Sequence, residues 1–135
     1  MANTMQFDLV SPERSLASLQ ATEVQIPAAE GYMTAMPDHA PTITSLKPGV
    51  LRVVSDSGSQ DYIVTGGFAE ISGEATSVLA ERAIPRDEFT ADELTALVND
   101  ARKAQENAPD DAVEAATKLV ADLVAVGDEI GISVR

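Results

Sequence analysis

Apolar and polar side chains alternate in short runs along residues 1–85. The alternation is clear at Met5–Leu9, Val24–Ile26, Leu51–Val53 and Tyr62–Val64. Between the runs stand segments rich in Pro, Gly, Ser or Asp, namely SPER, PAAEG, PDHAP, KPG, DSGS and SGE. A period of two residues is typical of strands with one buried face, and such segments are typical of turns. The pattern therefore predicts a sandwich or barrel of antiparallel strands.

Glycines mark two places where a strand needs a special backbone conformation. The segment DSGS at 56–59 predicts a hairpin turn, because Gly58 can take the positive φ of a tight hairpin. Gly66 and Gly67 interrupt the apolar run IVTGGFAEI, where glycine weakens a strand. We expect a bulge that turns the strand between two sheets there, and close packing against a partner is the alternative.

After Pro85 the apolar period becomes helical. Thr90 and Glu93 have the spacing of a capping box, which predicts the start of a helix. One face of this helix carries Leu94, Leu97, Val98 and Ala101. We expect the helix to end near Asn107, because Pro109 cannot continue it.

A second helix is expected to begin at Pro109 and to end at Gly127. Proline at the first helical position loses only an amide that would have no partner, and the following Asp110 and Asp111 complement the positive end of the helix dipole. Glycine is a common C-terminal residue of helices. Because the link between the helices is very short, they are expected to form an antiparallel hairpin.

The change of period divides the chain into two predicted parts. Residues 1–86 form the β domain, and residues 87–135 form the helical hairpin with a C-terminal tail. The end of this tail, IGISV at 130–134, alternates as a strand would, and its role stays open.

Composition and charge narrow the classes of function. The chain has 135 residues and no cysteine, which excludes disulfides, thiolate metal sites and cysteine nucleophiles. Its net charge is −13, from 4 − 10 = −6 in residues 1–85 and 5 − 12 = −7 in residues 86–135. Binding to nucleic acid or to anionic lipid requires a basic surface, so we expect neither. A protein that docks onto other proteins fits this composition better.

Nothing in the sequence indicates a membrane span or an export signal. No apolar run approaches the roughly 18 residues that a transmembrane helix needs. The start, MANTMQFDLV, has no basic segment and no long apolar segment, so we expect no signal or transit peptide. The cytoplasm is therefore the expected compartment.

Candidates for chemistry are few. His39 is the only histidine, and the adjacent Asp38 does not complete a catalytic or metal-binding group. The spacings HExxH, GxSxG and the P-loop do not occur. We therefore expect no catalytic residue, no metal site and no cofactor. The His39 ring either satisfies backbone groups of the loop between Pro37 and Pro41 or contacts a partner.

The segment around His39 also holds large apolar side chains. Tyr32, Met33 and Met36 lie close to predicted turns, and such residues are enriched at protein contacts. We therefore consider them a candidate contact surface. The alternative is that Met33 and Met36 point inward as core residues.

Four segments together resemble a known family. They are LVSPER at 9–14, EGYMTAMPDHAP at 30–41, LKPGVLRV at 46–53 and TGGFAEIS at 65–72. In this order they resemble the epsilon subunit of the proton-translocating rotary ATP synthase, of the bacterial type. The resemblance is strong over about residues 5–85. In the hairpin the match is in architecture and length more than in sequence. It implies a ten-stranded antiparallel β-sandwich followed by an antiparallel two-helix hairpin.

The resemblance also implies partners and a role. Such subunits have no active site, bind the gamma subunit and the c-subunit ring in the central stalk, and couple proton flow to rotation and ATP synthesis. The loop of Glu30, Gly31, Tyr32 and Met33 would contact the c ring, with the turn of His39 at the same end.

Several turn residues of the family pattern would hold the β domain in shape rather than contact a partner. They are Pro37, Pro41, Gly49, Gly66 and Gly67.

Regulation by the hairpin is a further property that the resemblance implies. Extended hairpins of the family reach the catalytic alpha and beta subunits and commonly present basic side chains. Residues 110–126 carry four acidic side chains and only Lys118, a net −3, so we expect weak or absent inhibition. Some members bind ATP through [IL]-D-x-x-R-A. Here Arg102 is kept, but Asn99 and Lys103 depart from that motif, which makes nucleotide binding doubtful.

The leading interpretation is therefore a non-catalytic rotor subunit on the cytoplasmic face of the bacterial inner membrane, attached only through protein partners. One alternative is a small nucleotide-binding β-sandwich with the hairpin as a lid. An enzyme that depends on His39 is the other alternative.

Overall fold

The computed structural model describes residues 3–132. The chain folds into two compact units, Met1–Asp87 and Glu88–Arg135. The first unit contains ten strands: β1 Met5–Val10, β2 Ser15–Ala21, β3 Glu23–Ala28, β4 Gly31–Ala35, β5 Thr42–Ser45, β6 Gly49–Ser55, β7 Gly58–Val64, β8 Gly67–Ile71, β9 Ala75–Ala80 and β10 Ala83–Pro85. A short 3-10 helix, η1 Arg86–Glu88, spans the boundary between the units. The second unit contains α1 Ala91–Glu106, the 3-10 helix η2 Asp110–Ala112 and α2 Val113–Ile130.

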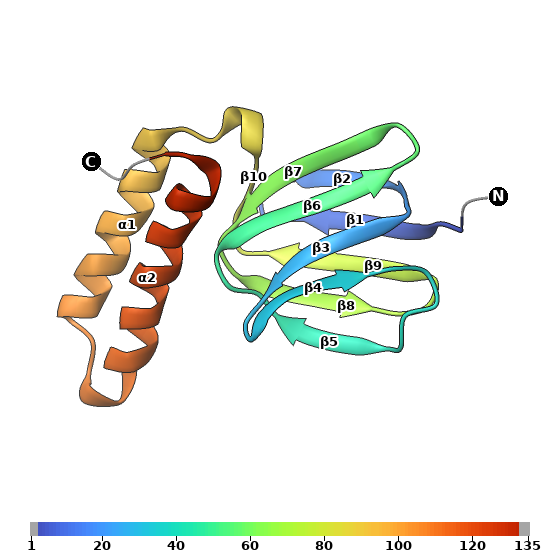
Figure 1. The fold of residues 1–135 in the computed structure, drawn as a ribbon. Helices are drawn as coiled ribbons and strands as arrows, with labels where there is room; N and C mark the ends of the chain where they lie inside the picture. The colour runs from blue at the N-terminus through green and yellow to red at the C-terminus, as the bar shows by residue number, and fades with distance from the viewer. Residues whose placement is uncertain (1–2, 133–135) are drawn as a thin grey trace. The chain divides into compact units, whose positions relative to one another are not determined.

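The ten strands form two five-stranded sheets (Figure 1). The first sheet has the order β2-β1-β9-β8-β5, and the second has the order β10-β7-β6-β3-β4. Neighbouring strands are antiparallel, except that β1 and β9 pair in parallel. The predicted β-sandwich with a C-terminal two-helix hairpin is confirmed.

The core of the sandwich comes from the alternating positions of the sequence. In β1 the burial follows the period of two, with Met5, Phe7 and Leu9 buried and the residues between them partly exposed. Ile26 of β3 and Leu51 of β6 are fully buried as well and belong to the same cluster. Side chains from the inner faces of two sheets interdigitate in this way in β-sandwiches.

Gly66 and Gly67 lie where the chain leaves one sheet for the other. Strand β7 ends at Val64 in the second sheet, and β8 begins at Gly67 in the first. The predicted passage between the sheets is present. Backbone hydrogen bonds continue across it, from the Thr65 amide to the Arg82 carbonyl at 3.2 Å and from the Glu81 amide to the Gly66 carbonyl at 2.9 Å. The register is the same on both sides, so no residue is inserted and the expected bulge is wrong. Gly67 has φ +117°, and a Cβ on it would collide with the carbonyl oxygen of Leu79. The close packing is thus against the chain's own backbone.

Helix α1 begins and ends as the sequence predicts. The Thr90 hydroxyl accepts a hydrogen bond from the Glu93 amide at 3.2 Å, as an N-cap does. The helix ends at Glu106, and Asn107 follows as the C-cap. Leu94, Val98 and Ala101 form its buried face.

Helix α2 differs from the prediction at both ends. Pro109 precedes the single turn η2, and α2 itself begins at Val113. At the other end the helix continues through Gly127 to Ile130, and Gly131, with φ +78°, is the left-handed cap. A Cβ on Gly127 would lie 2.7 Å from Leu94 Cδ2, so this glycine allows α1 and α2 to approach closely.

The alternation at 130–134 indicated a strand, and this indication is wrong where the segment overlaps α2. Ile130 is the last residue of the helix. Residues 133–134 of that segment lie outside the described residues. Within residues 3–132, neither helix is long and apolar enough to cross a membrane.

Candidate functional site

Strand β4 carries most of the residues predicted to contact the c ring. Glu30 is exposed in the β3–β4 turn, and Gly31 begins the strand with φ +141°. Tyr32 is exposed, whereas Met33 packs against the hydrophobic core. Neighbouring residues of a strand point to opposite faces, so Tyr32 and Met33 do not share one contact surface. The alternative of an inward Met33 is right, whereas Met36 is 52% exposed.

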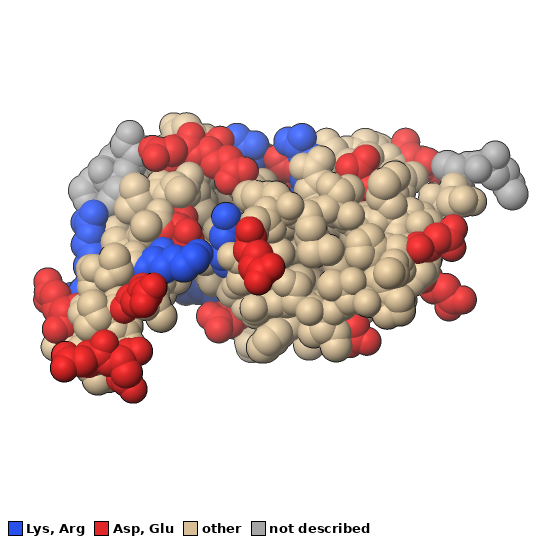
Figure 2. Space-filling view, turned by 60° about the horizontal axis from the view of Figure 1, so that its bottom comes forward, with Lys and Arg blue, Asp and Glu red and all other residues tan. Residues whose placement is uncertain are grey.

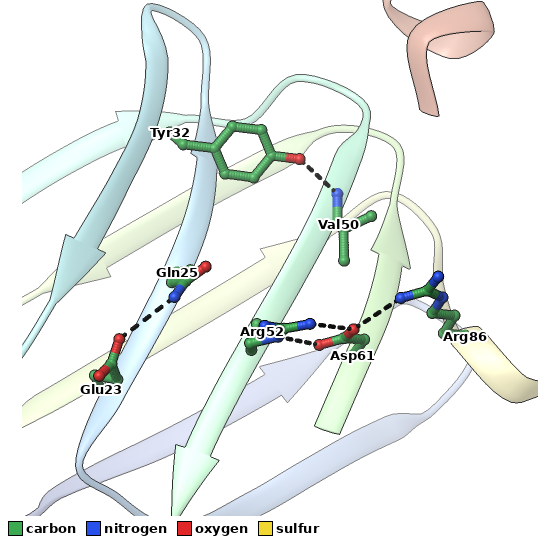
Figure 3. Close-up of polar contacts among 7 residues, drawn as sticks. All are labelled: Glu23, Gln25, Tyr32, Val50, Arg52, Asp61 and Arg86. Atoms are coloured by element: carbon green, nitrogen blue, oxygen red, sulfur yellow. Dashed lines mark hydrogen bonds and ion pairs between the residues drawn. The ribbon is translucent and has the colours of Figure 1, made fainter. Parts of the chain in front are cut away.

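Tyr32 holds the end of the sandwich together. Its hydroxyl accepts a hydrogen bond from the Val50 amide at 2.9 Å, and Figure 3 shows this bond crossing from β4 to β6. The Lys47 ammonium lies 5.4 Å from the centre of the Tyr32 ring, within the range of a cation–π contact. One aromatic side chain thereby links β4 to the β5–β6 turn.

The register of the second sheet explains why Val50 needs this partner. Strand β3 pairs with β6 only from Glu23 to Gln25. Continuing that register would place Pro27 opposite Val50, but the Pro27 carbonyl already accepts from the Lys47 amide at 2.9 Å. The Tyr32 hydroxyl takes the place of the missing backbone acceptor, which satisfies a buried donor.

Gly49 is shaped by the same contact. A Cβ on Gly49 would lie 2.5 Å from Pro27 Cβ and 2.8 Å from the Tyr32 hydroxyl oxygen. Only glycine therefore fits between these two side chains. The sequence pattern named Gly49 as a turn residue, but it gave no sign of the link between Tyr32 and Val50, which are 18 positions apart.

The His39 turn lies at the other end of β4. The Asp38 amide donates to the Gly73 carbonyl in the β8–β9 turn at 2.9 Å, and the His39 amide donates to the Met36 carbonyl at 3.1 Å. Asp38 has φ +70°, a left-handed conformation that Asp tolerates. The five residues of β4 separate this turn from Glu30, so the expectation that His39 lies at the same end is wrong.

The His39 ring serves its own loop. Its Nδ1 lies 2.7 Å from the Ala40 carbonyl oxygen, which is the bond expected of a ring that satisfies loop backbone groups. Pro37 and Pro41 bracket the turn, and the Thr42 hydroxyl donates to the same carbonyl at 3.0 Å. In the part of the chain that the structure describes, no three or more His, Asp or Glu side chains form a metal-binding group.

An open groove of about 590 Å³ runs between the edge strands of the two sheets. Residues 28–33 line one side of it, and residues 42–45 of β5 line the other. It therefore adjoins the predicted contact loop and not the His39 turn.

An exposed apolar patch on the outer face of the first sheet was missed by the sequence analysis. It consists of Ile43, Phe68 and Leu79, whose exposed fractions are 74%, 60% and 61%. Phe68 and Leu79 are opposite each other on β8 and β9, and Ile43 lies on the neighbouring β5. Alternation alone could have found Phe68 and Leu79, because they flank the buried positions Ala69 and Val78.

Polar and charged side chains surround the apolar patch. On β1 and β2 the same face is mostly polar, apart from the partly exposed Val10 beside Leu79, and the Gln6 amide donates to Ser18 Oγ at 3.0 Å there. Figure 2 shows acidic side chains around a broad uncharged area of the sandwich surface. Contiguous exposed apolar side chains with a polar rim are typical of protein interfaces.

The residues of the degenerate ATP motif lie on α1. Asn99, Arg102 and Lys103 are all exposed.

Comparisons with known proteins agree with this architecture. The family model described as ATP synthase, Delta/Epsilon chain, beta-sandwich domain, matches residues 4–86. The ATP synthase epsilon chain of Ruegeria sp. (strain TM1040) is 57% identical, over 98% of this chain and 100% of the relative. The ATP synthase epsilon chain of Rhodobacter capsulatus is 53% identical, again over 98% and 100% of the two chains.

Solved structures share the fold. A chain of the Euglena gracilis mitochondrial ATP synthase, solved as OSCP/F1/c-ring in rotational state 1, is similar with a TM-score of 0.68 and 24% identity, over 88% of this chain and 76% of that one. A chain of the Tetrahymena thermophila mitochondrial ATP synthase, solved as central stalk and c ring, has a TM-score of 0.54 and 17% identity, over 87% and 97%.

Proposed function

The chain belongs to the ATP synthase epsilon chain family, and on that premise we propose that it is a non-catalytic subunit of the central stalk. It binds the gamma subunit and the c-subunit ring, and it transmits rotation between proton flow and ATP synthesis. The observation that carries the proposal is the exposed apolar patch of Ile43, Phe68 and Leu79 on a rigid sheet. Such a patch needs a protein partner, and a close-packed sandwich passes force on with little deformation.

The gamma subunit is the proposed partner of the apolar patch. Aromatic and aliphatic side chains at the centre of an interface contribute most of its binding free energy. Phe68 and Leu79 are adjacent across the β8–β9 pair and are both more than half exposed, so a partner could cover them together.

The c ring is the proposed partner of the β3–β4 turn. Glu30, Gly31 and the exposed side of Tyr32 form this contact, and the groove beside them gives it an open approach. Met33 supports the strand from the core side instead of touching the ring. A contact centred on Glu30 does not reach His39, because β4 lies between them.

The subunit is placed at the cytoplasmic face of the bacterial inner membrane by its protein partners. Its net charge of −13 repels anionic lipid headgroups and nucleic acid alike. Neither a cofactor nor a metal ion is part of the proposed role.

Inhibition of hydrolysis by the hairpin is proposed to be weak. Helix α2 carries Glu114, Asp122, Asp128 and Glu129 against Lys118 alone, so its net charge is 1 − 4 = −3. A helix of this sign repels acidic loops on a partner. Titration calorimetry with Mg-ATP tests the nucleotide-lid alternative, which requires micromolar binding to the isolated chain.

Add-back to membranes depleted of the subunit tests the main proposal. The wild-type chain should restore ATP-driven proton pumping, measured by quenching of a pH-sensitive dye. The double variant Phe68→Asp, Leu79→Asp should lose binding to gamma by tenfold or more, since about 1.4 kcal/mol already gives a factor of ten. Ser18→Asp, on the polar half of the same sheet face, is the matched control. Full pumping with the double variant would contradict the proposal.

The c-ring contact has its own pair of variants. Glu30→Lys reverses a charge in the β3–β4 turn, and Glu74→Lys makes the same change in the β8–β9 turn. We expect uncoupling of hydrolysis from pumping with the first and wild-type coupling with the second. Equal coupling in the two variants would show that Glu30 does not contact the c ring.

A further inference from the structure

Asp61 joins two arginines on the outer face of the second sheet. Its Oδ1 accepts from Arg52 Nε at 2.8 Å, and its Oδ2 accepts from Arg52 Nη2 at 3.1 Å and from Arg86 Nη1 at 3.2 Å. Figure 3 shows Arg52 and Arg86 reaching Asp61 from β6 and from the segment after β10. The Asp61 side chain is only 12% exposed, so water competes little for it.

Arg86 stands where the chain leaves the sheet. Strand β10 is three residues long and pairs with β7 only from Tyr62 to Val64. Proline at 85 cannot donate to a ladder, and the chain turns into η1. A hollow of about 290 Å³ follows, lined by Ser59, Gln60, Asp61, Arg86 and Asp87. After β10 the hollow separates the chain from the edge of β7, and the Arg86 side chain extends across it to Asp61.

The other side of the junction is fixed by the helix cap. Thr90 caps α1 through the Glu93 amide, and α1 begins at Ala91. Between Arg86 and Thr90 lie residues 87–89, which contain the end of a single 3-10 turn. Such turns have poorer hydrogen-bond geometry than α-helices and are frequent as connectors, and the boundary between the two units lies in this one, between Asp87 and Glu88.

We propose that the Asp61–Arg86 ion pair is a tether that ends the sandwich at residue 86 and confines the hinge between the two units to residues 87–89. Before β10, the Arg82 carbonyl is bonded to the Thr65 amide at 3.2 Å, and Ala83 is buried in the core. Without the tether, only the last pairs of β10 with β7, at Ile84 and Pro85, hold the chain near residue 86, so the hinge extends back toward residue 84. The tether thus sets how much freedom the helical unit has. The inference concerns the isolated chain and does not depend on the proposed function.

The charges around Asp61 suit this role. Hydrogen bonding to Arg52 lowers the pKa of Asp61, with a smaller contribution from Arg86 against the opposing effect of burial. Asp61 therefore stays ionised at neutral pH. Arg52 binds both oxygens and orients the carboxylate.

Hydrogen–deuterium exchange of the full chain tests the tether. In Arg86→Gln and in Asp61→Asn, amide exchange over residues 83–87 should become about two- to fivefold faster, as loss of a modest ion pair implies. Asp56→Asn makes the same charge change in the exposed β6–β7 turn and should have no effect there. Arg52→Gln keeps the Arg86 contact and should change these amides much less.

Distance distributions between spin labels test the hinge itself. The chain has no cysteine, so Glu74→Cys and Asp100→Cys can be labelled selectively, one in each unit. The distribution should be broader in Arg86→Gln and in Asp61→Asn than in Asp56→Asn. Equal widths in all three would overturn the proposal, as would equal exchange in Arg86→Gln and Arg52→Gln.

Discussion

Removal of the Tyr32 hydroxyl tests how the end of the sandwich is held. In Tyr32→Phe the ring stays, and with it the contact of Lys47, so only the oxygen 2.9 Å from the Val50 amide is lost. Val50 is 8% exposed, and the Pro27 carbonyl that could replace the hydroxyl is bound to Lys47. The Val50 amide is left without a partner.

The magnitude follows from the burial of that amide. An unsatisfied buried donor costs about 1–3 kcal/mol. Tyr32 itself is 46% exposed, so water can approach from its side, and the lower half of this range applies. We expect a loss of about 1–2 kcal/mol in the free energy of unfolding. In a domain of this size each kcal/mol shifts Tm by about 4–8 °C, so Tm should fall by about 4–16 °C.

Tyrosine fluorescence gives a clean assay. The chain has no Trp and two Tyr, and both lie in the sandwich, so their emission follows unfolding of the sandwich and not of the helices. Tyr62→Phe is the matched control, because the Tyr62 hydroxyl forms no hydrogen bond with any of residues 3–132. Each variant keeps one tyrosine as the probe. Urea titration at constant temperature gives the free energy, and heating gives Tm.

The comparison between the two variants decides the result. Tyr62→Phe should stay within about 0.5 kcal/mol of the wild type, as substitutions without a structural mechanism do. If Tyr32→Phe is equally neutral, the Val50 amide finds another partner, and the account of Tyr32 as a structural link is wrong.

Three further predictions concern the glycine crossing, the ion pair and the hairpin. Gly67→Ala should lower the free energy of unfolding in urea by at least about 3 kcal/mol, because the added Cβ meets the Leu79 carbonyl. Gly58→Ala has open space around its Cβ and should lower it by only about 1–2 kcal/mol. Similar losses in the two variants would refute the steric argument. The lowered pKa of Asp61 means that its stabilisation is present above the unfolded value of about 4 and is lost as the pH falls through the lower folded value. The gap in unfolding free energy between wild type and Asp61→Asn should therefore narrow as the pH falls below about 4. A gap that does not change between neutral and strongly acidic pH would contradict this assignment. Deletion of residues 88–135 should raise ATP hydrolysis by the assembled enzyme less than about twofold, because the negative charge of α2 opposes docking on acidic loops. A several-fold rise would show that the hairpin inhibits hydrolysis.

Local sequence patterns predicted the elements where the physics is local. The period of two identified the buried residues of β1, because a strand with one covered face must alternate. The Thr90 cap was predictable because it involves a hydroxyl and an amide three residues apart. The end of α2 was not, because Gly127 and Gly131 both suit a C-cap, and the close approach of Leu94 decides between them.

The candidate contact surface was predicted in part. Glu30 and Tyr32 are exposed as expected, but the turn of His39 lies at the opposite end of β4, since a five-residue strand separates segments that are close in sequence. Met33 points to the core because of its register on β4. The exposed patch of Phe68 and Leu79 could have been read from alternation, whereas its continuity with Ile43 required the strand order.

The sequence by itself determined which segments become strands and helices, where the chain changes from one to the other, and which family it belongs to. The strands and helices depend on hydrophobic period, turn residues and caps, all of which act over a few positions, and the family was identified from the resemblance of four short segments. Only the tertiary structure decided that Tyr32 bonds to Val50, that Arg86 bonds to Asp61, and that Gly67 faces the Leu79 carbonyl. These pairs are 12 to 25 positions apart or are set by sheet register, and strand order and register arise from packing the whole core at once.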